Sequence, residues 1–172
     1  ILRDAQKSIR ALEKSIKECE KQILALYDSD EELKRSYDHL TSIKGISIVN
    51  ATAMIAYTNN FKNITTSRKL ASYYGIAPFR EMSGTSVNKK AEVKCYSSSM
   101  LRAYLTQAAQ WTIKEHGIYR EYYLRMSAKG KCYGVILNNV KNKLLHLSVS
   151  LIANDMDYEE NHEFLRAQRM AQ

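Results

Sequence analysis

The segment Ile43-Lys-Gly-Ile-Ser-Ile-Val-Asn-Ala-Thr-Ala-Met-Ile-Ala-Tyr57 sets the fold around a single turn. Gly45 offers a positive φ for that turn, and Ser47 can cap the helix that follows. Small and apolar residues then run to Ala56, which predicts a largely buried helix. Two helices joined in this way form a helix-hairpin-helix-like motif, whose backbone amides can hold a DNA phosphate. An ordinary αα-hairpin with a glycine turn fits the same residues.

The residues before this turn carry a heptad repeat. Apolar side chains recur every seven residues in two series, which are Leu2, Ile9, Ile16 and Ile23, and Ala5, Leu12, Cys19, Leu26, Leu33 and Leu40. Such a narrow apolar stripe predicts a coiled coil, and therefore a homodimer or higher oligomer through residues 2–40. The alternative is a long helix packed antiparallel on the next helix of its own chain. Residues 28–32 fit a helix stop followed by a new N-cap at Ser29 or Asp30.

Helical patterns also continue after the turn. Residues 65–67 can cap a short helix that Gly75 ends in a left-handed conformation. Ser97 to Ser99 can cap a helix over 100–116, and two more helices are predicted over 119–128 and 133–154. The sequence therefore predicts an all-α fold, with a coiled-coil arm (1–42), a compact helical domain (43–153) and an acidic tail (154–172).

One segment interrupts the helical pattern. It contains Pro78, the only proline of the chain, and then a Pro/Ser/Gly loop with hydroxyls at Ser83, Thr85 and Ser86 around Gly84. Small hydroxyl residues among cations are typical of places where phosphates are bound. The same residues also fit a flexible turn, since serine is common in turns.

The net charge of +8 is unevenly distributed along the chain. Residues 43–153 hold 16 basic and 4 acidic side chains, a net charge of +12, whereas the segments before and after have net charges of −1 and −3. A basic block of this kind predicts a polyanionic partner, with nucleic acid the first candidate, although solubility is an alternative. The candidate nucleic-acid-binding residues are Lys44, Gly45, Ser47, Arg68, Lys69, Arg80, Lys89, Lys90, Lys94 and Arg102.

Metal-binding and membrane-spanning patterns are missing from the sequence. The three cysteines are widely spaced and form no CxxC pair, so no zinc site, cofactor site or disulfide framework is indicated. No apolar run has the length of a membrane span, and we expect a cytoplasmic location. The chain begins with Ile rather than Met, which we interpret as the sign of a piece of a longer protein.

The order of these motifs resembles the C-terminal transposase domain of the DEDD insertion-sequence transposases, the bridge-RNA-guided recombinases. The resemblance runs from about Leu40 to Ala109 and rests on four stretches, which are Ile43-Lys-Gly-Ile46, Ser67-Arg-Lys-Leu-Ala-Ser-Tyr-Tyr-Gly-Ile-Ala-Pro78, Ser83-Gly-Thr-Ser86 and Leu101-Arg-Ala-Tyr-Leu-Thr-Gln-Ala-Ala109. It implies site-specific DNA transposition and recombination, in a bacterial, nucleoid-associated setting. The implied partners are double-stranded DNA and a structured guide RNA.

The resemblance also implies a divided active site. In that family, a serine five residues after the proline attacks a DNA phosphodiester and forms a phosphoserine link; the matching residue here is Ser83. A RuvC-like domain supplies the carboxylates that bind Mg²⁺, and it is absent from these residues, so this chain alone is expected to be inactive. The chain departs from the family pattern at Thr85, where a second glycine is usual, and at Lys94-Cys-Tyr-Ser-Ser-Ser99, where Lys-Arg-Gly is usual.

Other interpretations of the residues stay open. None of the four histidines lies in the Pro78 segment, so it holds no self-contained Ser-His-Asp arrangement. Ser86 is an alternative nucleophile, and Tyr73 and Tyr74 flank the segment. The alternative function is a non-enzymatic, dimeric DNA- or RNA-binding module.

Overall fold

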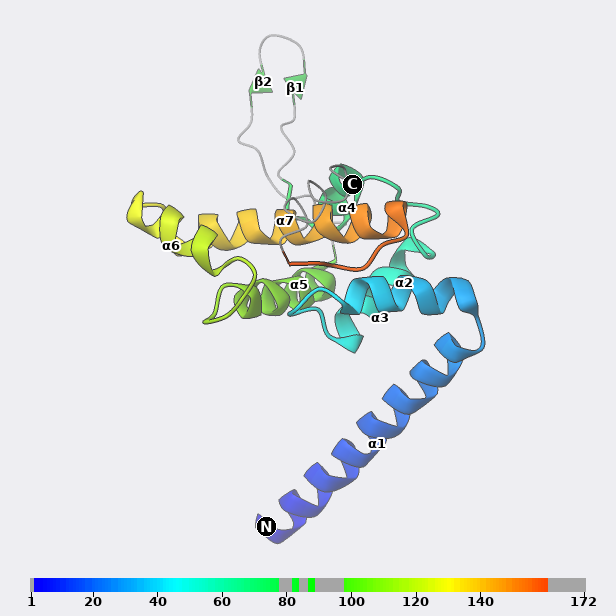
Figure 1. Ribbon diagram of the computed structural model, residues 1–172. Helices are drawn as coiled ribbons and strands as arrows, with labels where there is room; N and C mark the ends of the chain where they lie inside the picture. Colours follow the sequence, from blue (N-terminus) through cyan, green and yellow to red (C-terminus); the bar gives the residue numbers. More distant parts are fainter. Residues whose placement is uncertain (1, 78–81, 84–86, 89–97, 161–172) are drawn as a thin grey trace.

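A computed structural model describes residues 2–77, 82–83, 87–88 and 98–160 (Figure 1). The described residues form the helices α1 (Leu2–Asp28), α2 (Glu31–Thr41), α3 (Ile48–Thr58), α4 (Ser67–Tyr73), α5 (Ser99–Thr112), α6 (Arg120–Ala128) and α7 (Tyr133–Asn154). They also form two short antiparallel strands, β1 (Met82–Ser83) and β2 (Val87–Asn88). The predicted all-α class is therefore confirmed. The strand pair lies within the predicted irregular loop, and Pro78 is outside the described residues.

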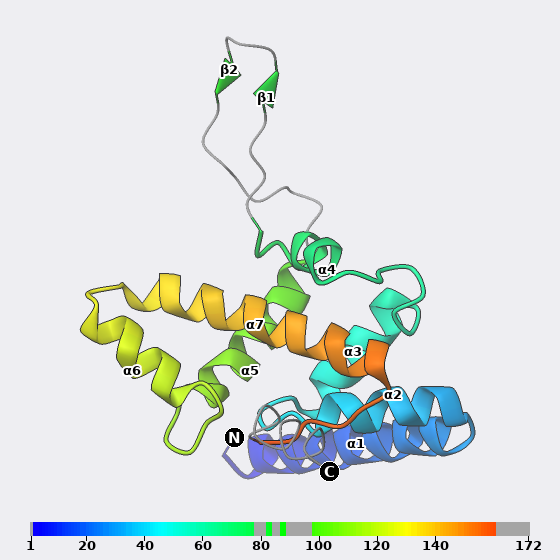
Figure 2. The same ribbon diagram turned by 45° about the horizontal axis from the view of Figure 1, so that its top comes forward.

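Helix α7 is the centre of the helical body. It packs against α2, α4, α5 and α6, while α3 packs against both α2 and α5 (Figure 2). The most deeply buried side chains include Val140, Leu144 and Leu145 of α7, together with Leu101 and Leu105 of α5. These residues belong to one hydrophobic core, which fixes the direction of α5 relative to the other helices.

Side-chain caps define where four of these helices begin. The cap residues are Asp30 for α2, Ser47 for α3, Thr66 for α4 and Ser98 for α5, and each accepts a hydrogen bond from a backbone N–H of the first turn. Each lies where the sequence predicts a cap. Gly75 follows α4 with φ of 64°, so its predicted left-handed conformation is confirmed as well.

The turn between α2 and α3 requires a glycine. Gly45 has φ of +108°, and a Cβ at this position would lie 2.8 Å from Thr112 Cγ2 and 3.4 Å from the Ala108 carbonyl oxygen. An L side chain is strained at this φ, and the space is occupied by the end of α5. The turn therefore packs directly against the last turn of α5.

Helix α1 extends away from the helical body (Figure 1). Among the described residues, α1 is anchored only at its C-terminal end: the Tyr27 ring stacks on Tyr37 with centroids 4.6 Å apart, and its hydroxyl donates to Thr52 Oγ1 at 3.0 Å. Leu2 is 82% exposed and Leu12 is 65% exposed. Within the described residues, the N-terminal part of the heptad stripe is thus not covered by another helix of the same chain.

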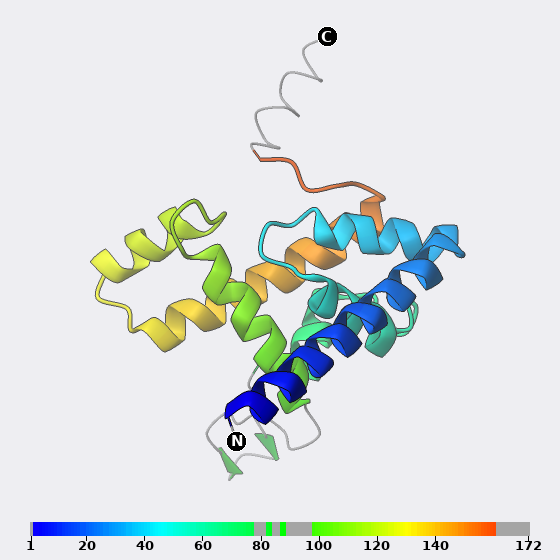
Figure 3. The ribbon, with the colours of Figure 1, turned by 90° about the horizontal axis from the view of Figure 1, so that it is seen from below.

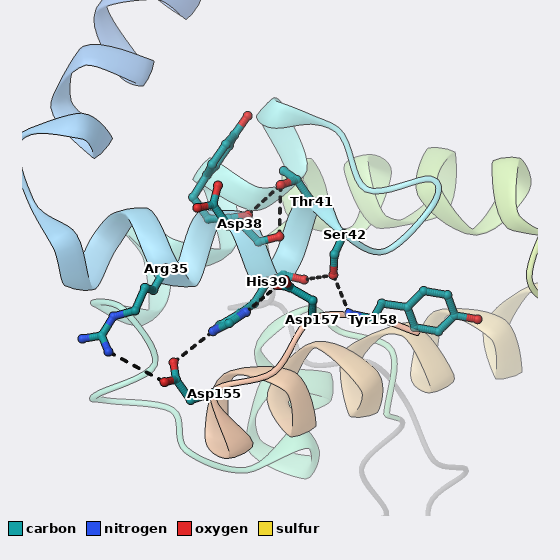
Figure 4. A network of polar contacts seen from close by, with 9 residues as sticks. Arg35, Asp38, His39, Thr41, Ser42, Asp155, Asp157 and Tyr158 are labelled. Atoms are coloured by element: carbon teal, nitrogen blue, oxygen red, sulfur yellow. Dashed lines mark hydrogen bonds and ion pairs between the residues drawn. The ribbon is translucent and has the colours of Figure 1, made fainter. Parts of the chain in front are cut away.

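The chain folds back over α2 after α7 ends (Figure 3). His39 is held between two carboxylates, with Nδ1 2.8 Å from Asp157 Oδ1 and Nε2 3.0 Å from Asp155 Oδ1 (Figure 4). The backbone N–H of Tyr158 donates to Ser42 Oγ at 2.7 Å. The described part of the acidic tail is therefore attached to α2.

The contacts of His39 predict a pH-dependent stability. Burial lowers the pKa of His39, but the hydrogen bonds to Asp155 and Asp157 outweigh it and raise the pKa above 6.5. The charged imidazolium therefore stabilises the fold fully below the unfolded pKa, and this contribution is lost as the pH rises through the raised pKa. We expect the difference in unfolding free energy between the wild type and His39→Gln to shrink from about pH 5.5 to about pH 8.5.

Chemical denaturation at a series of pH values measures this difference. Asp157→Asn removes one partner of the imidazolium and should weaken the same pH dependence, which makes it a second, independent variant. If the unfolding free energy of the wild type exceeds that of His39→Gln by the same amount across this pH range, the result contradicts the stabilising role of the imidazolium charge.

Candidate nucleic-acid interface

Apart from Ser83, the candidate nucleic-acid-binding residues that the structure describes form two groups, one at each end of α5. Gly45 contacts Thr112 and Ala108 at the C-terminal end of the helix. Arg102 lies in its first turn, where its Nε donates to the Tyr74 carbonyl oxygen at 3.4 Å. Ten residues of α-helix separate Arg102 from Thr112, which corresponds to about 15 Å. The turn residues and Arg102 therefore occupy different parts of the surface.

The turn group combines Lys44, Gly45 and Ser47. The Ser47 hydroxyl accepts the capping hydrogen bond from the Asn50 backbone N–H at 3.5 Å. Lys44 is exposed, and its Nζ lies 2.6 Å from Glu160 Oε1 in the acidic tail. This hydrogen bond raises the pKa of Lys44. The helix-hairpin-helix-like function of this turn remains a prediction.

The second group lies on the helices that flank the Pro78 segment. Arg68 and Lys69 are exposed on α4, and Arg102 is half-buried on α5. Lys141 of α7 is a candidate for a phosphate contact from the sequence, although a solvated position is the simpler interpretation of a single lysine. In the structure it lies close enough to Arg102 to be affected by its charge. Burial, and then the charge of Arg102, lower the pKa of Lys141. An anion bound between these two cations would relieve their repulsion.

The backbone that leads into the Pro78 segment is held from two sides. Arg102 of α5 binds the carbonyl oxygen of Tyr74, and Asn138 Nδ2 of α7 donates to the carbonyl oxygen of Ile76 at 3.4 Å. In the strand pair that follows, Ser83 is the register partner of Val87. The segment carrying Ser83 thus leaves the helical body beside Arg102 and the helix that carries Lys141.

Several candidate residues lie outside the described part of the chain. These are Arg80, Lys89, Lys90, Lys94 and Ser86. Of the two flanking tyrosines, Tyr74 is 2% exposed, and burial raises the pKa of its hydroxyl well above the ordinary value. A phenol must lose its proton to act as a nucleophile, so the surroundings of Tyr74 do not suit that role.

The described residues contain neither a metal-binding cluster nor a membrane-spanning helix. Within 2–77, 82–83, 87–88 and 98–160, no group of three or more His, Cys, Asp or Glu side chains is arranged to hold a metal ion. No helix among these residues is long and apolar enough to cross a membrane. These residues therefore do not fit the family's magnesium site.

The helical body carries Lys44 at the α2–α3 turn, and Arg68, Lys69, Arg102 and Lys141 on the helices that lie near the base of the Ser83 segment, so it suits a polyanionic partner. Residues 37–124 match the family described as "Transposase IS116/IS110/IS902 family". The chain belongs to this family of transposases. The matched range begins in α2 and ends in α6, so it includes the turn, the strand pair and all of α5. The resemblance stated from the sequence is thereby confirmed.

Curated relatives agree with this assignment. The chain is 28% identical over 160 residues to proteins named "Pilin gene-inverting protein" from Moraxella bovis and Moraxella lacunata, which covers 91% of this chain and 49% of each relative. It is 25% identical over 120 residues to an insertion element IS110 protein from Streptomyces coelicolor, which covers 70% of this chain and 29% of that relative. The chain spans about half the length of the first two relatives.

Proposed function

We propose that this chain is the serine-bearing, DNA-binding part of a transposase that catalyses site-specific DNA transposition, with Ser83 as the nucleophile. The observation that carries the proposal is the placement of the Ser83 segment, which leaves the helical body where Arg102 binds the Tyr74 carbonyl oxygen. Lys141 of α7 is near enough to Arg102 for that charge to lower the Lys141 pKa, and the same helix holds the Ile76 carbonyl oxygen through Asn138. Both cations would therefore attract a DNA phosphate to the base of this segment.

The proposed reaction is a phosphoryl transfer. Ser83 Oγ loses its proton to a base and forms a bond to the phosphorus of a phosphodiester. The phosphorus–oxygen bond to one sugar breaks, and that sugar oxygen leaves as a hydroxyl after taking up a proton. Cations that contact the phosphate would stabilise the charge that develops on the phosphoryl oxygens. Because a serine hydroxyl is a weak nucleophile at neutral pH, it requires a base or a metal ion near it.

We assign that requirement to another part of the full-length protein. When bound there by carboxylates, Mg²⁺ would activate the nucleophile and stabilise the leaving oxygen. The chain by itself would then bind DNA without cleaving it. A structured guide RNA as a second partner, and a nucleoid-associated location, rest on the family resemblance. A relative whose name denotes pilin gene inversion is consistent with recombination at defined sites.

Duplex DNA binding by this chain tests the proposal. The dissociation constant should rise steeply with salt, because each neutralised phosphate contributes about −0.9 to the slope of log affinity against log salt. Arg102→Gln and Lys141→Gln should each reduce that slope by about one. The control is Lys62→Gln, since Lys62 already pairs with Glu32 at 2.9 Å. Flat salt dependence, or slopes that none of these substitutions changes, would count against the proposed binding site.

We also propose that α1 pairs with α1 of a second copy. Its heptad stripe is open in this structure, with Ile9 55% and Ile16 58% exposed, and a coiled coil would cover both. Placing aspartates at these two positions should turn a concentration-dependent dimer into a monomer in analytical ultracentrifugation. The matched control carries aspartates at Lys14 and Lys21, outside the stripe. A wild-type chain that remains monomeric at high concentration would contradict the pairing.

A further inference from the structure

A groove between the α2–α3 turn, α5 and α6 plays no part in the chemistry proposed for Ser83. It has a volume of about 950 Å³, at the upper end of the range of about 300–1,000 Å³ typical of ligand sites. We call it the α5–α6 groove. Its floor includes Ile46 of the turn, and its two sides carry side chains of α5 on one hand and of α6 and the start of α7 on the other.

The α5 side of the groove presents one face of a helix. Gln107, Gln110 and Trp111 line it, and their spacing of three and four residues places them on adjacent turns of the same face, while Lys114 follows just after the helix ends at Thr112. Trp111 is 64% exposed. The Lys114 ammonium lies 4.8 Å from the centroid of the Trp111 ring. This side therefore offers an accessible aromatic ring, a cation and two amides that can each donate and accept hydrogen bonds.

The facing side repeats the combination of aromatic rings with a cation. Tyr123 of α6 and Tyr133 of α7 meet edge to face with centroids 6.3 Å apart, and Tyr133 is 49% exposed. The Arg120 guanidinium lies 5.7 Å from the Tyr123 ring centroid, and its Nη1 donates to the Ile113 carbonyl oxygen at 3.2 Å. That hydrogen bond fixes the charged group at the edge of the groove.

The composition of the lining indicates the chemistry of its occupant. Among the residues that the structure describes, two cations, Lys114 and Arg120, line the groove, and no Asp or Glu does. An anionic group is therefore favoured over a cationic or neutral one. An acidic peptide would satisfy the cations, but it would leave the rings without flat partners. An unpaired nucleotide supplies a flat ring to stack, polar edges for the amides and a phosphate for the cations.

We propose that the α5–α6 groove binds an unpaired base of a nucleic acid strand. The base stacks on Trp111, its edge meets the Gln107 and Gln110 amides, and the adjoining phosphate lies near Lys114 and Arg120. This deepens the proposed nucleic-acid-binding function and rests on it, but it does not depend on Ser83. The groove lies at the end of α5 opposite Arg102, so it would hold a strand distinct from the phosphodiester at the Ser83 segment.

Trp111 is the only tryptophan of the chain, so its fluorescence reports on the groove directly. The chain is titrated with a short single-stranded DNA, with the matching RNA, and with the same strands in which the bases are replaced by abasic sites. We expect the strands with bases to quench the fluorescence and the abasic strands to leave it nearly unchanged. Quenching by DNA alone, by RNA alone or by both identifies the source of the base, and each supports the proposal.

Substitution separates this site from the duplex site. Trp111→Ala should weaken single-strand binding by about 5-fold to 150-fold, because stacking of one base contributes about 1–3 kcal/mol. Trp111→Phe should recover much of the loss, whereas Tyr57→Ala, at an exposed tyrosine outside the groove, should have no effect. Binding is followed by anisotropy of a labelled strand, and the salt-dependent duplex affinity is measured on the same variants.

The possible outcomes are distinct. Loss of single-strand binding in Trp111→Ala with duplex binding intact supports the groove proposal. Equal quenching by intact and abasic strands, or unchanged single-strand affinity in Trp111→Ala, overturns it while leaving the duplex site standing. Absence of duplex binding in the wild type counts against the proposed function, whatever the groove binds.

Discussion

Ser83→Ala in the full-length transposase is expected to reduce excision and insertion by roughly 10³-fold or more, the scale of loss when a covalent nucleophile is removed. Without Oγ, no bond to phosphorus can form, and the remaining binding and electrostatic groups cannot replace that step. Duplex affinity should stay within about twofold of wild type, because Arg102 and Lys141 still attract the phosphate. A plasmid excision assay and a binding assay on the same preparation measure both quantities.

Ser86→Ala is the matched control for this substitution. It removes the same hydroxyl from the neighbouring serine, three residues further along, and should leave recombination largely unchanged. The opposite pattern, an active Ser83→Ala and an inactive Ser86→Ala, would move the nucleophile to Ser86. Full activity in both variants would leave the chain as a DNA- or RNA-binding module with no covalent role.

Gly45→Ala is expected to destabilise the fold by about 2–6 kcal/mol. Part of the loss is the strain of an L residue at φ of +108°, which costs on the order of 1–3 kcal/mol. The rest comes from a Cβ placed 2.8 Å from Thr112 Cγ2, which forces the turn away from α5 and costs about 1–3 kcal/mol in a well-packed interior. Urea unfolding followed by circular dichroism measures the change.

Substitutions at two other glycines allow the backbone strain and the packing contact to be measured separately. Gly130 has φ of +72° with nothing within 4 Å of an added Cβ, so Gly130→Ala should show the backbone strain alone. Gly134 lies at the start of α7 in open space, so Gly134→Ala should stabilise by about 0.5–1 kcal/mol. If Gly45→Ala and Gly130→Ala cost the same, the close packing of the turn on Thr112 contributes little to stability.

Local features of the fold could be predicted from the sequence because their determinants lie within a few residues. Asp30, Ser47 and Ser98 each cap a helix through a backbone N–H two or three residues ahead. The predicted helix over 133–154 coincides with α7. A capping side chain and an apolar period act within one or two turns, so the order of residues is enough to recognise them.

The predicted C-terminal boundary of one helix was wrong, because a contact with a later part of the chain sets it, and not the local helix propensity. The helix predicted over 100–116 ends at Thr112, because the chain turns back there and the Tyr119 backbone N–H donates to the Thr112 carbonyl oxygen at 2.8 Å. A Cβ at Gly117 would lie 2.3 Å from that same oxygen. Gly117 therefore permits the close return of the chain to Thr112, after the helix has already ended.

The contacts between residues far apart in the chain could not be predicted from the sequence. His39 and Asp155 are 116 residues apart, and nothing near either residue indicates that they pair. The separation of the Gly45 turn from Arg102 follows from how α5 packs on α3 and α7. The α5–α6 groove also depends on tertiary packing, because Trp111 and Tyr133 meet there only through the return of the chain after α6.

Capture of the covalent intermediate tests the central claim most directly. The full-length transposase is incubated with Mg²⁺ and a DNA substrate, denatured and digested, and the DNA-linked peptide is identified by mass spectrometry. The proposed mechanism predicts a phosphodiester bond on Ser83 Oγ, absent from Ser83→Ala. A link to Ser86, Tyr73 or any other residue, or recombination that proceeds with no covalent intermediate, would contradict it.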